Sequence, residues 1–160
     1  VALTGGIGLL KLPPEWVAIK EASIPGIIGL AFLVSQFTGR PLIGLFLLKS
    51  EIFDIERIEG HLRGDGQKAA FDRVVRRSNG LFVASFFLSA VLNFVLAKKI
   101  VVSAAGSDAF NEELGRMTLL SYPVIAVPTM IITLIALVLL FHGIEKLTGL
   151  TADELVVHRR

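Results

Sequence analysis

Amide and hydroxyl side chains within long apolar stretches are the residues of this chain that could do chemistry. Ser85, Ser89 and Asn93 recur every four residues, so on a helix they would form a polar stripe along one face. Asn79 returns to within about 40° of the same face. Because an amide in a membrane span is costly without a partner, we expect Asn93 to bond to another helix. A path for a polar solute is the alternative.

A second polar pair, Ser35 and Gln36, stands near the end of another apolar stretch. Ser35 also belongs to a series of small residues, with Ala31 and Gly39, whose four-residue spacing lets two helices approach closely. Close packing and a polar path are both open for this pair. The full candidate seam or solute path comprises Ser35, Gln36, Asn79, Ser85, Ser89 and Asn93.

Arginines flank these apolar stretches. Arg40 follows one stretch, while Arg73, Arg76 and Arg77 precede the next. Guanidinium groups at such boundaries extend toward lipid phosphates or pair with acids on a neighbouring helix. We therefore expect these four arginines at the membrane interface, in contact with lipid phosphate.

Other kinds of site find little support in the sequence. The chain has no cysteine, which excludes disulfides and thiolate nucleophiles. His61, His142 and His158 lack the spacing of metal ligands. The net charge of +2 is too small, and too evenly mixed with acids, for nucleic-acid binding. We predict no catalytic residue, no metal, no cofactor and no enzymatic activity.

Three uncharged stretches must position the polar residues, namely 22–39, 78–97 and 117–141. Each is near the roughly 20 apolar residues that a helix needs to cross a bilayer. The chain is 53% hydrophobic and 19% charged, and the charges lie between these stretches. The sequence predicts an all-α, polytopic transmembrane helix bundle, with the lipid bilayer as its first partner.

The segment between the first two spans, 41–77, predicts an amphipathic helix that begins near Pro41. Its apolar residues recur at helical spacing with charged residues between them. Glycines after this helix predict a turn, and 67–77 predicts a second short helix. In the third span, Pro123 and Pro128 should kink the helix.

The sequence also predicts the structure of both ends of the chain. Segment 1–10 is apolar but too short to span, so we expect it to be the end of a truncated helix. Segment 11–21 should be a connection, because Pro13 and Pro14 disfavour a helix. The transmembrane domain would cover 1–147, and 148–160 would be a polar C-terminal tail.

Lysine and arginine counts predict the orientation. Segment 40–77 carries eight of them, against three in 98–116 and two in 11–21. The positive-inside rule then places 40–77 in the cytoplasm, and the C-terminus returns to the same side.

Three stretches of the chain resemble the bacterial proteins grouped around inner-membrane septation protein A. In the first, Lys20 leads a span that closes in Gly39, Arg40, Pro41 and Leu42, similar to the family's Gly-Lys/Arg-Pro-Leu-Ile box. The second is the aromatic-rich span with an asparagine near each end. The third, 110–143, is similar to the family's last span. A longer insert after Leu48 and two prolines in the last span favour an uncharacterised branch of the family.

The resemblance implies a multi-span, non-enzymatic protein of the bacterial inner membrane, linked to cell envelope growth and division. On this basis we expect a scaffold or accessory subunit that acts through helix–helix contacts with other membrane proteins or with further copies of itself. The alternative is a small-solute transporter or channel subunit that uses the stripe ending at Asn93 and the proline-broken third span.

Overall fold

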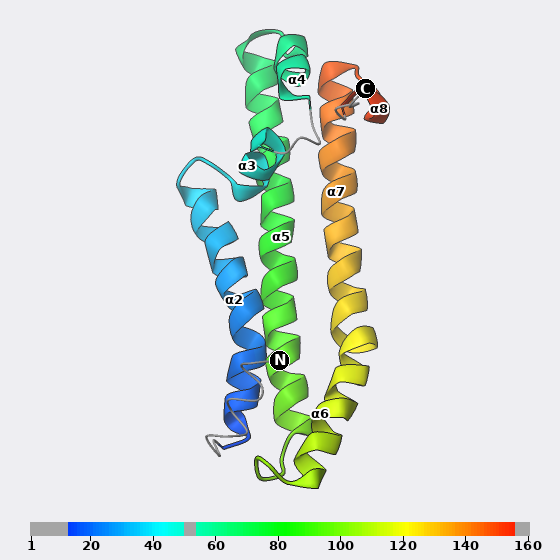
Figure 1. Cartoon of the computed structure of the whole chain (residues 1–160). Coiled ribbons are helices and arrows are strands. Elements are labelled where there is room, and N and C mark those ends of the chain that lie inside the picture. Colours follow the sequence, from blue (N-terminus) through cyan, green and yellow to red (C-terminus); the bar gives the residue numbers. More distant parts are fainter. Residues whose placement is uncertain (1–12, 50–53, 156–160) are drawn as a thin grey trace. The chain divides into compact units, whose positions relative to one another are not determined.

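The computed structural model describes residues 13–49 and 54–155, and within this part of the chain every regular element is helical (Figure 1). The all-α fold class is confirmed. The expected helix end at 1–10 lies outside the described residues. The elements in chain order are α2 (Glu15–Phe37), α3 (Leu42–Lys49), α4 (Ile55–His61), α5 (Gly64–Ile100), α6 (Asp108–Ser121), η1 (Tyr122–Ala126), α7 (Val127–Thr148) and α8 (Ala152–Leu155).

Within the described residues, three helices are long and apolar enough to cross a membrane: α2, α5 and the continuous run Asp108–Thr148. This chain is accordingly a multi-pass membrane protein. Helix α5 has 37 residues, or about 55 Å at 1.5 Å per residue. It exceeds a hydrocarbon core of about 30 Å, so part of it must extend beyond the core.

The first span begins earlier than expected. Pro13 and Pro14 do not interrupt the chain there, since their carbonyls accept hydrogen bonds from the amides of Trp16 and Val17 at 3.0 Å and lead into α2. Proline is tolerated at a helix start because its missing N–H would have no partner there. Pro25, by contrast, lies inside the helix.

The polar insert differs from the expected single amphipathic helix, because α3 and α4 are separate. Asp54 begins α4 as its N-cap, and its carboxylate accepts a hydrogen bond from the Arg57 amide at 3.0 Å. The expected short helix 67–77 is instead continuous with the second span in α5. No glycine or proline lies between Gln67 and Ser78 to end it.

The proline-rich part of the third span adopts a π-helical turn, η1, between α6 and α7. Pro123 lies in this turn, and the Val127 amide donates to the Tyr122 carbonyl five residues earlier. A π turn re-pairs backbone groups that a proline leaves without a donor. The interruption that the prolines predict in the third span is therefore this π-helical turn.

The chain forms two compact units. Unit 1 comprises Val1–Gly29 and Ser85–Ile131. Its core joins the start of α2, the end of α5 and α6 through six buried residues: Val17, Ala18, Ala97, Val101, Phe110 and Met117. At Gly29 an added Cβ would lie only 3.1 Å from the Cβ of Phe86, so α2 and α5 approach closely here. Ala31, expected at such a contact, is exposed.

Unit 2 comprises Leu30–Ala84 and Ile132–Arg160. The ring of Phe32 on α2 stacks on Phe82 of α5, with centroids 5.6 Å apart. Gly143 of α7 lies against Val74 of α5, where an added Cβ would be 2.6 Å from a valine methyl carbon. Interleaved side chains of this kind make the helices of the unit depend on one another.

Candidate functional site

Asn79 is the centre of a polar cluster in unit 2, and its side chain is fully buried. Its Nδ2 donates to the Phe32 carbonyl at 3.0 Å and to Oε1 of Gln36 at 2.7 Å. Its Oδ1 accepts from the Ile43 amide at 3.3 Å. One amide thereby joins α2, α3 and α5, which satisfies a polar group that would otherwise be costly to bury.

Gln36 and Arg76 form a reciprocal pair next to Asn79. The Gln36 Nε2 donates to the Arg76 carbonyl at 3.1 Å, and Nη1 of Arg76 donates to the Gln36 carbonyl at 3.3 Å. The guanidinium thus caps the last turn of α2, where a cation is favoured by the helix dipole. Arg76, expected at lipid phosphate, has this protein partner.

Ser35 completes the cluster at the turn between α2 and α3. Its hydroxyl donates to the Phe32 carbonyl at 2.6 Å and accepts from the Leu42 amide at 3.0 Å. Gly39 has a φ of +74°, a left-handed conformation that glycine adopts without strain. The box from Gly39 to Leu42, with Pro41 inside it, is therefore this turn.

The other three seam residues belong to unit 1. Ser85 is buried, and its hydroxyl donates to the Thr129 carbonyl of α7 at 3.1 Å. Asn93 donates to the carbonyl and hydroxyl of Ser89 at 2.8 and 3.3 Å. Both bonds stay within α5, so the expected bond from Asn93 to a neighbouring helix is not among those the structure describes. Within the stripe, Asn93 and Ser89 bond to each other at i, i+4 spacing, whereas Ser85 bonds to α7.

The remaining predicted residues are at the surface or in ion pairs. Arg40, Arg73 and Arg77 are exposed. Lys20 pairs with Glu21 at 2.7 Å inside α2. The exposed arginines are free to contact solvent or lipid headgroups.

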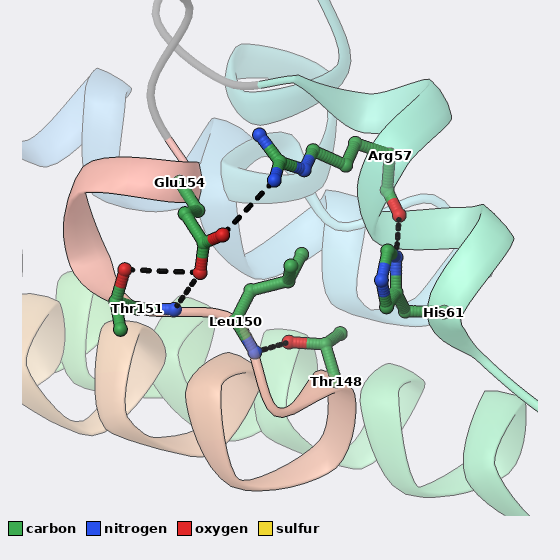
Figure 2. A network of polar contacts seen from close by, with 6 residues as sticks. All are labelled: Arg57, His61, Thr148, Leu150, Thr151 and Glu154. Atoms are coloured by element: carbon green, nitrogen blue, oxygen red, sulfur yellow. Dashed lines mark hydrogen bonds and ion pairs between the residues drawn. The ribbon is translucent and has the colours of Figure 1, made fainter.

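The short helices α4 and α8 form a second polar cluster that sequence reasoning missed (Figure 2). Arg57 of α4 pairs with Glu154 of α8 at 3.0 Å. Glu154 also accepts from the amide and hydroxyl of Thr151 at 2.9 and 3.0 Å. The spacing Thr-x-x-Glu is a helix-start signal that could have predicted α8 within the expected tail.

Apolar burial accompanies this cluster. Leu155 is fully buried, and its carbonyl accepts from the Asp54 amide at 3.0 Å. On α4, Ile58 is 1% exposed. The pKa of Glu154 lies below its usual value because the Thr151 amide and hydroxyl bond to the carboxylate, with a further contribution from the charge of Arg57.

The histidines show no metal arrangement in the described part of the chain. His61 bonds to the Arg57 carbonyl at 2.7 Å, and His142 lies 3.7 Å from Glu145. His158 lies outside the described residues. Among 13–49 and 54–155, no group of three or more metal-ligating side chains comes together.

Comparisons with family models, with curated proteins and with solved structures found no match for this chain.

Proposed function

We propose that this multi-pass membrane protein is a non-enzymatic protein of the bacterial inner membrane, which acts as a scaffold or accessory subunit through helix–helix contacts. The resemblance to the septation protein A-like family adds a proposed link to cell envelope growth and division. The partners would be other membrane proteins or further copies of the chain.

The self-contained bonding of the polar cluster around Asn79 carries this proposal. Its donors and acceptors are used to join α2, α3 and α5, so they hold the protein's own helices together. The apolar face of α7 is by contrast exposed, with Ile131, Leu134, Ile135 and Val138 at helical spacing. Such a face suits lipid or a partner helix.

The orientation proposed is a cytoplasmic insert and a cytoplasmic C-terminus. The ion pair between Arg57 and Glu154 supports a common side for both segments, because two groups 3.0 Å apart cannot lie on opposite sides of a bilayer. The excess of lysine and arginine in 40–77 supports the cytoplasm as that side.

Site-specific crosslinking tests the scaffold proposal. The chain has no cysteine, so each introduced thiol is unique. A cysteine at Leu134 or Val138 on the exposed face should form crosslinks in membranes to a partner identified by mass spectrometry. The matched control is Ala136→Cys on the buried face of the same helix, which should not crosslink. No adduct from either exposed position, and a protein that purifies alone in mild detergent, would contradict the proposal.

A transporter or channel subunit is the second candidate, favoured by the π-helical turn η1. Such turns occur frequently at functional sites, and Ser85 bonds to Thr129 just after this one. Counterflow in proteoliposomes that is lost in Asn93→Ala would support transport. It would also exclude a scaffold as the sole role.

A further inference from the structure

A pocket of about 290 Å³ opens in unit 2 beside the turn between α2 and α3. Its walls are mostly apolar and come from α3, α5 and the turn, and they include Gly39 and Gly44. The apolar side chains that line it are Pro41, Leu45, Phe71 and Val75, and the charged ones are Arg40 and Asp72. The volume is at the lower end of ligand pockets, so it suits a small group.

One cation and one anion line this pocket. Both Arg40 and Asp72 are exposed, and neither forms an ion pair with another side chain among the described residues. A ligand that carries one negative and one positive charge would satisfy both. A purely anionic ligand would meet repulsion from the Asp72 carboxylate.

The position of the pocket favours a lipid as that ligand. Arg40 comes three residues after α2, one of the three membrane-length helices, and Asp72 lies about two helical turns before Asn79 on α5. The pocket is therefore at the end of the apolar stretches, where phospholipid headgroups lie.

The charged side chains around the pocket are of both signs. A second hollow shares Phe71 and Asp72 with the first and adds Glu59 and Lys68, so the charge stays mixed. Arg76 keeps its charge while it donates to the Gln36 carbonyl, and its Nη2 would be 4.0 Å from a Cβ at Gly39 of the pocket wall. Of the four arginines expected at lipid phosphate, Arg40 alone lines this pocket.

We infer that the pocket binds a phospholipid whose headgroup carries a primary ammonium, with the phosphate at Arg40 and the ammonium at Asp72. The apolar walls would contact the glycerol end of the lipid. This inference rests on the chain being a membrane protein, and it is independent of any partner protein.

Native mass spectrometry of the full chain tests the inference by competition between phosphatidylethanolamine, phosphatidylcholine and phosphatidylglycerol. Phosphatidylcholine is the matched control lipid, because its methylated ammonium cannot donate a hydrogen bond to Asp72. The unmodified protein should retain phosphatidylethanolamine about tenfold better than phosphatidylcholine, the effect of one charge-assisted hydrogen bond. Equal retention, or a preference for phosphatidylglycerol, would overturn the inference.

Two substitutions then assign the two contacts. Asp72→Asn should abolish the preference for phosphatidylethanolamine over phosphatidylcholine, whereas Arg40→Ala should weaken both lipids about tenfold. Arg116→Ala, an exposed cation on α6, is the matched control and should change neither. An unchanged preference in Asp72→Asn with an unchanged melting temperature would overturn the assignment. Because partner proteins are absent from this assay, failure of the scaffold proposal would leave its result unaffected.

Discussion

At the scale of single residues, Asn79 and Asn93 look alike in the sequence but have different surroundings. Both are amides in one apolar stretch, and the cost of an unpaired amide in lipid allows the sequence to predict that each has a partner. The identity of the partner depends on the turn at Gly39, which brings the Ile43 amide to Asn79. No spacing along α5 contains that information.

Replacing Asn79 with alanine should therefore destabilise the protein far more than the same change at Asn93. Asn79→Ala removes three hydrogen bonds and leaves the buried Ile43 amide without its side-chain acceptor, whereas the Phe32 carbonyl keeps its bond from Ser35. The expected cost is about 2–3 kcal/mol. Asn93→Ala removes bonds within one helix only and should cost under about 1 kcal/mol. Thermal unfolding in detergent measures both, and equal costs would contradict this distinction.

Ser78 offers the opposite test, because its buried hydroxyl has no hydrogen-bond partner among residues 13–49 and 54–155. Ser78→Ala should leave the melting temperature unchanged or raise it, since it removes a buried polar group without breaking a bond. Ser35→Ala is the matched control. This substitution should lower the free energy of unfolding by about 1 kcal/mol, because Ser35 bonds to Leu42 and Phe32. A marked loss in Ser78→Ala would show that the hydroxyl has a partner after all.

At the scale of helices, long spans are more predictable than short helices. An apolar stretch of about 20 residues is long enough to cross a bilayer as a helix. The existence of α2, α5 and α7 is therefore predictable from composition. Short helices such as α4 are marginal alone and depend on tertiary contacts. The buried Ile58 and Leu155 provide those contacts, and they come from segments far apart in the chain.

The contact between α5 and α7 leads to a prediction at Gly143. Gly143→Ala would place a methyl group 2.6 Å from Val74, so the helices must move apart at a cost of about 1–3 kcal/mol. Gly115→Ala on α6 is the matched control. Nothing lies within 4 Å of its added Cβ, and alanine favours the helix by about 0.5–1 kcal/mol. Val74→Ala combined with Gly143→Ala should recover part of the loss, and no recovery would place the clash elsewhere.

The contact of α8 with α4 should depend on pH. The pKa of Glu154 is lowered in the folded protein, because Thr151 donates to the carboxylate and Arg57 lies beside it. A lowered pKa means that the carboxylate stabilises this contact above its unfolded pKa of about 4.3, and that the stabilisation is lost as pH falls through the folded value. The protection of the α8 amides from hydrogen exchange, measured relative to the intrinsic exchange rate at each pH, should fall over that acidic range.

Two variants separate this effect from general acid unfolding. Glu154→Gln should expose the α8 amides already at neutral pH and flatten their pH response. Asp153→Asn, an exposed acid in the same helix, should behave as the unmodified protein. A pH response retained in Glu154→Gln would assign the titration to another group.

At the scale of the whole molecule, the side of the membrane that each connection occupies is the broadest prediction. Composition predicts the orientation because lysine and arginine resist translocation. The ion pair between Arg57 and Glu154 supports the common side of α4 and α8 independently of composition, because it ties the two helices to one side whichever side that is.

Single cysteines test the two statements separately. Glu59→Cys on α4, Asp153→Cys on α8 and Ala104→Cys between α5 and α6 are all at exposed positions. An impermeant maleimide should label only Ala104→Cys in intact cells, and all three after lysis. If Glu59→Cys and Asp153→Cys both react in intact cells while Ala104→Cys does not, the orientation is reversed and the α4–α8 contact stands. If Glu59→Cys and Asp153→Cys react on opposite sides, the contact itself is excluded, since no ion pair crosses a bilayer.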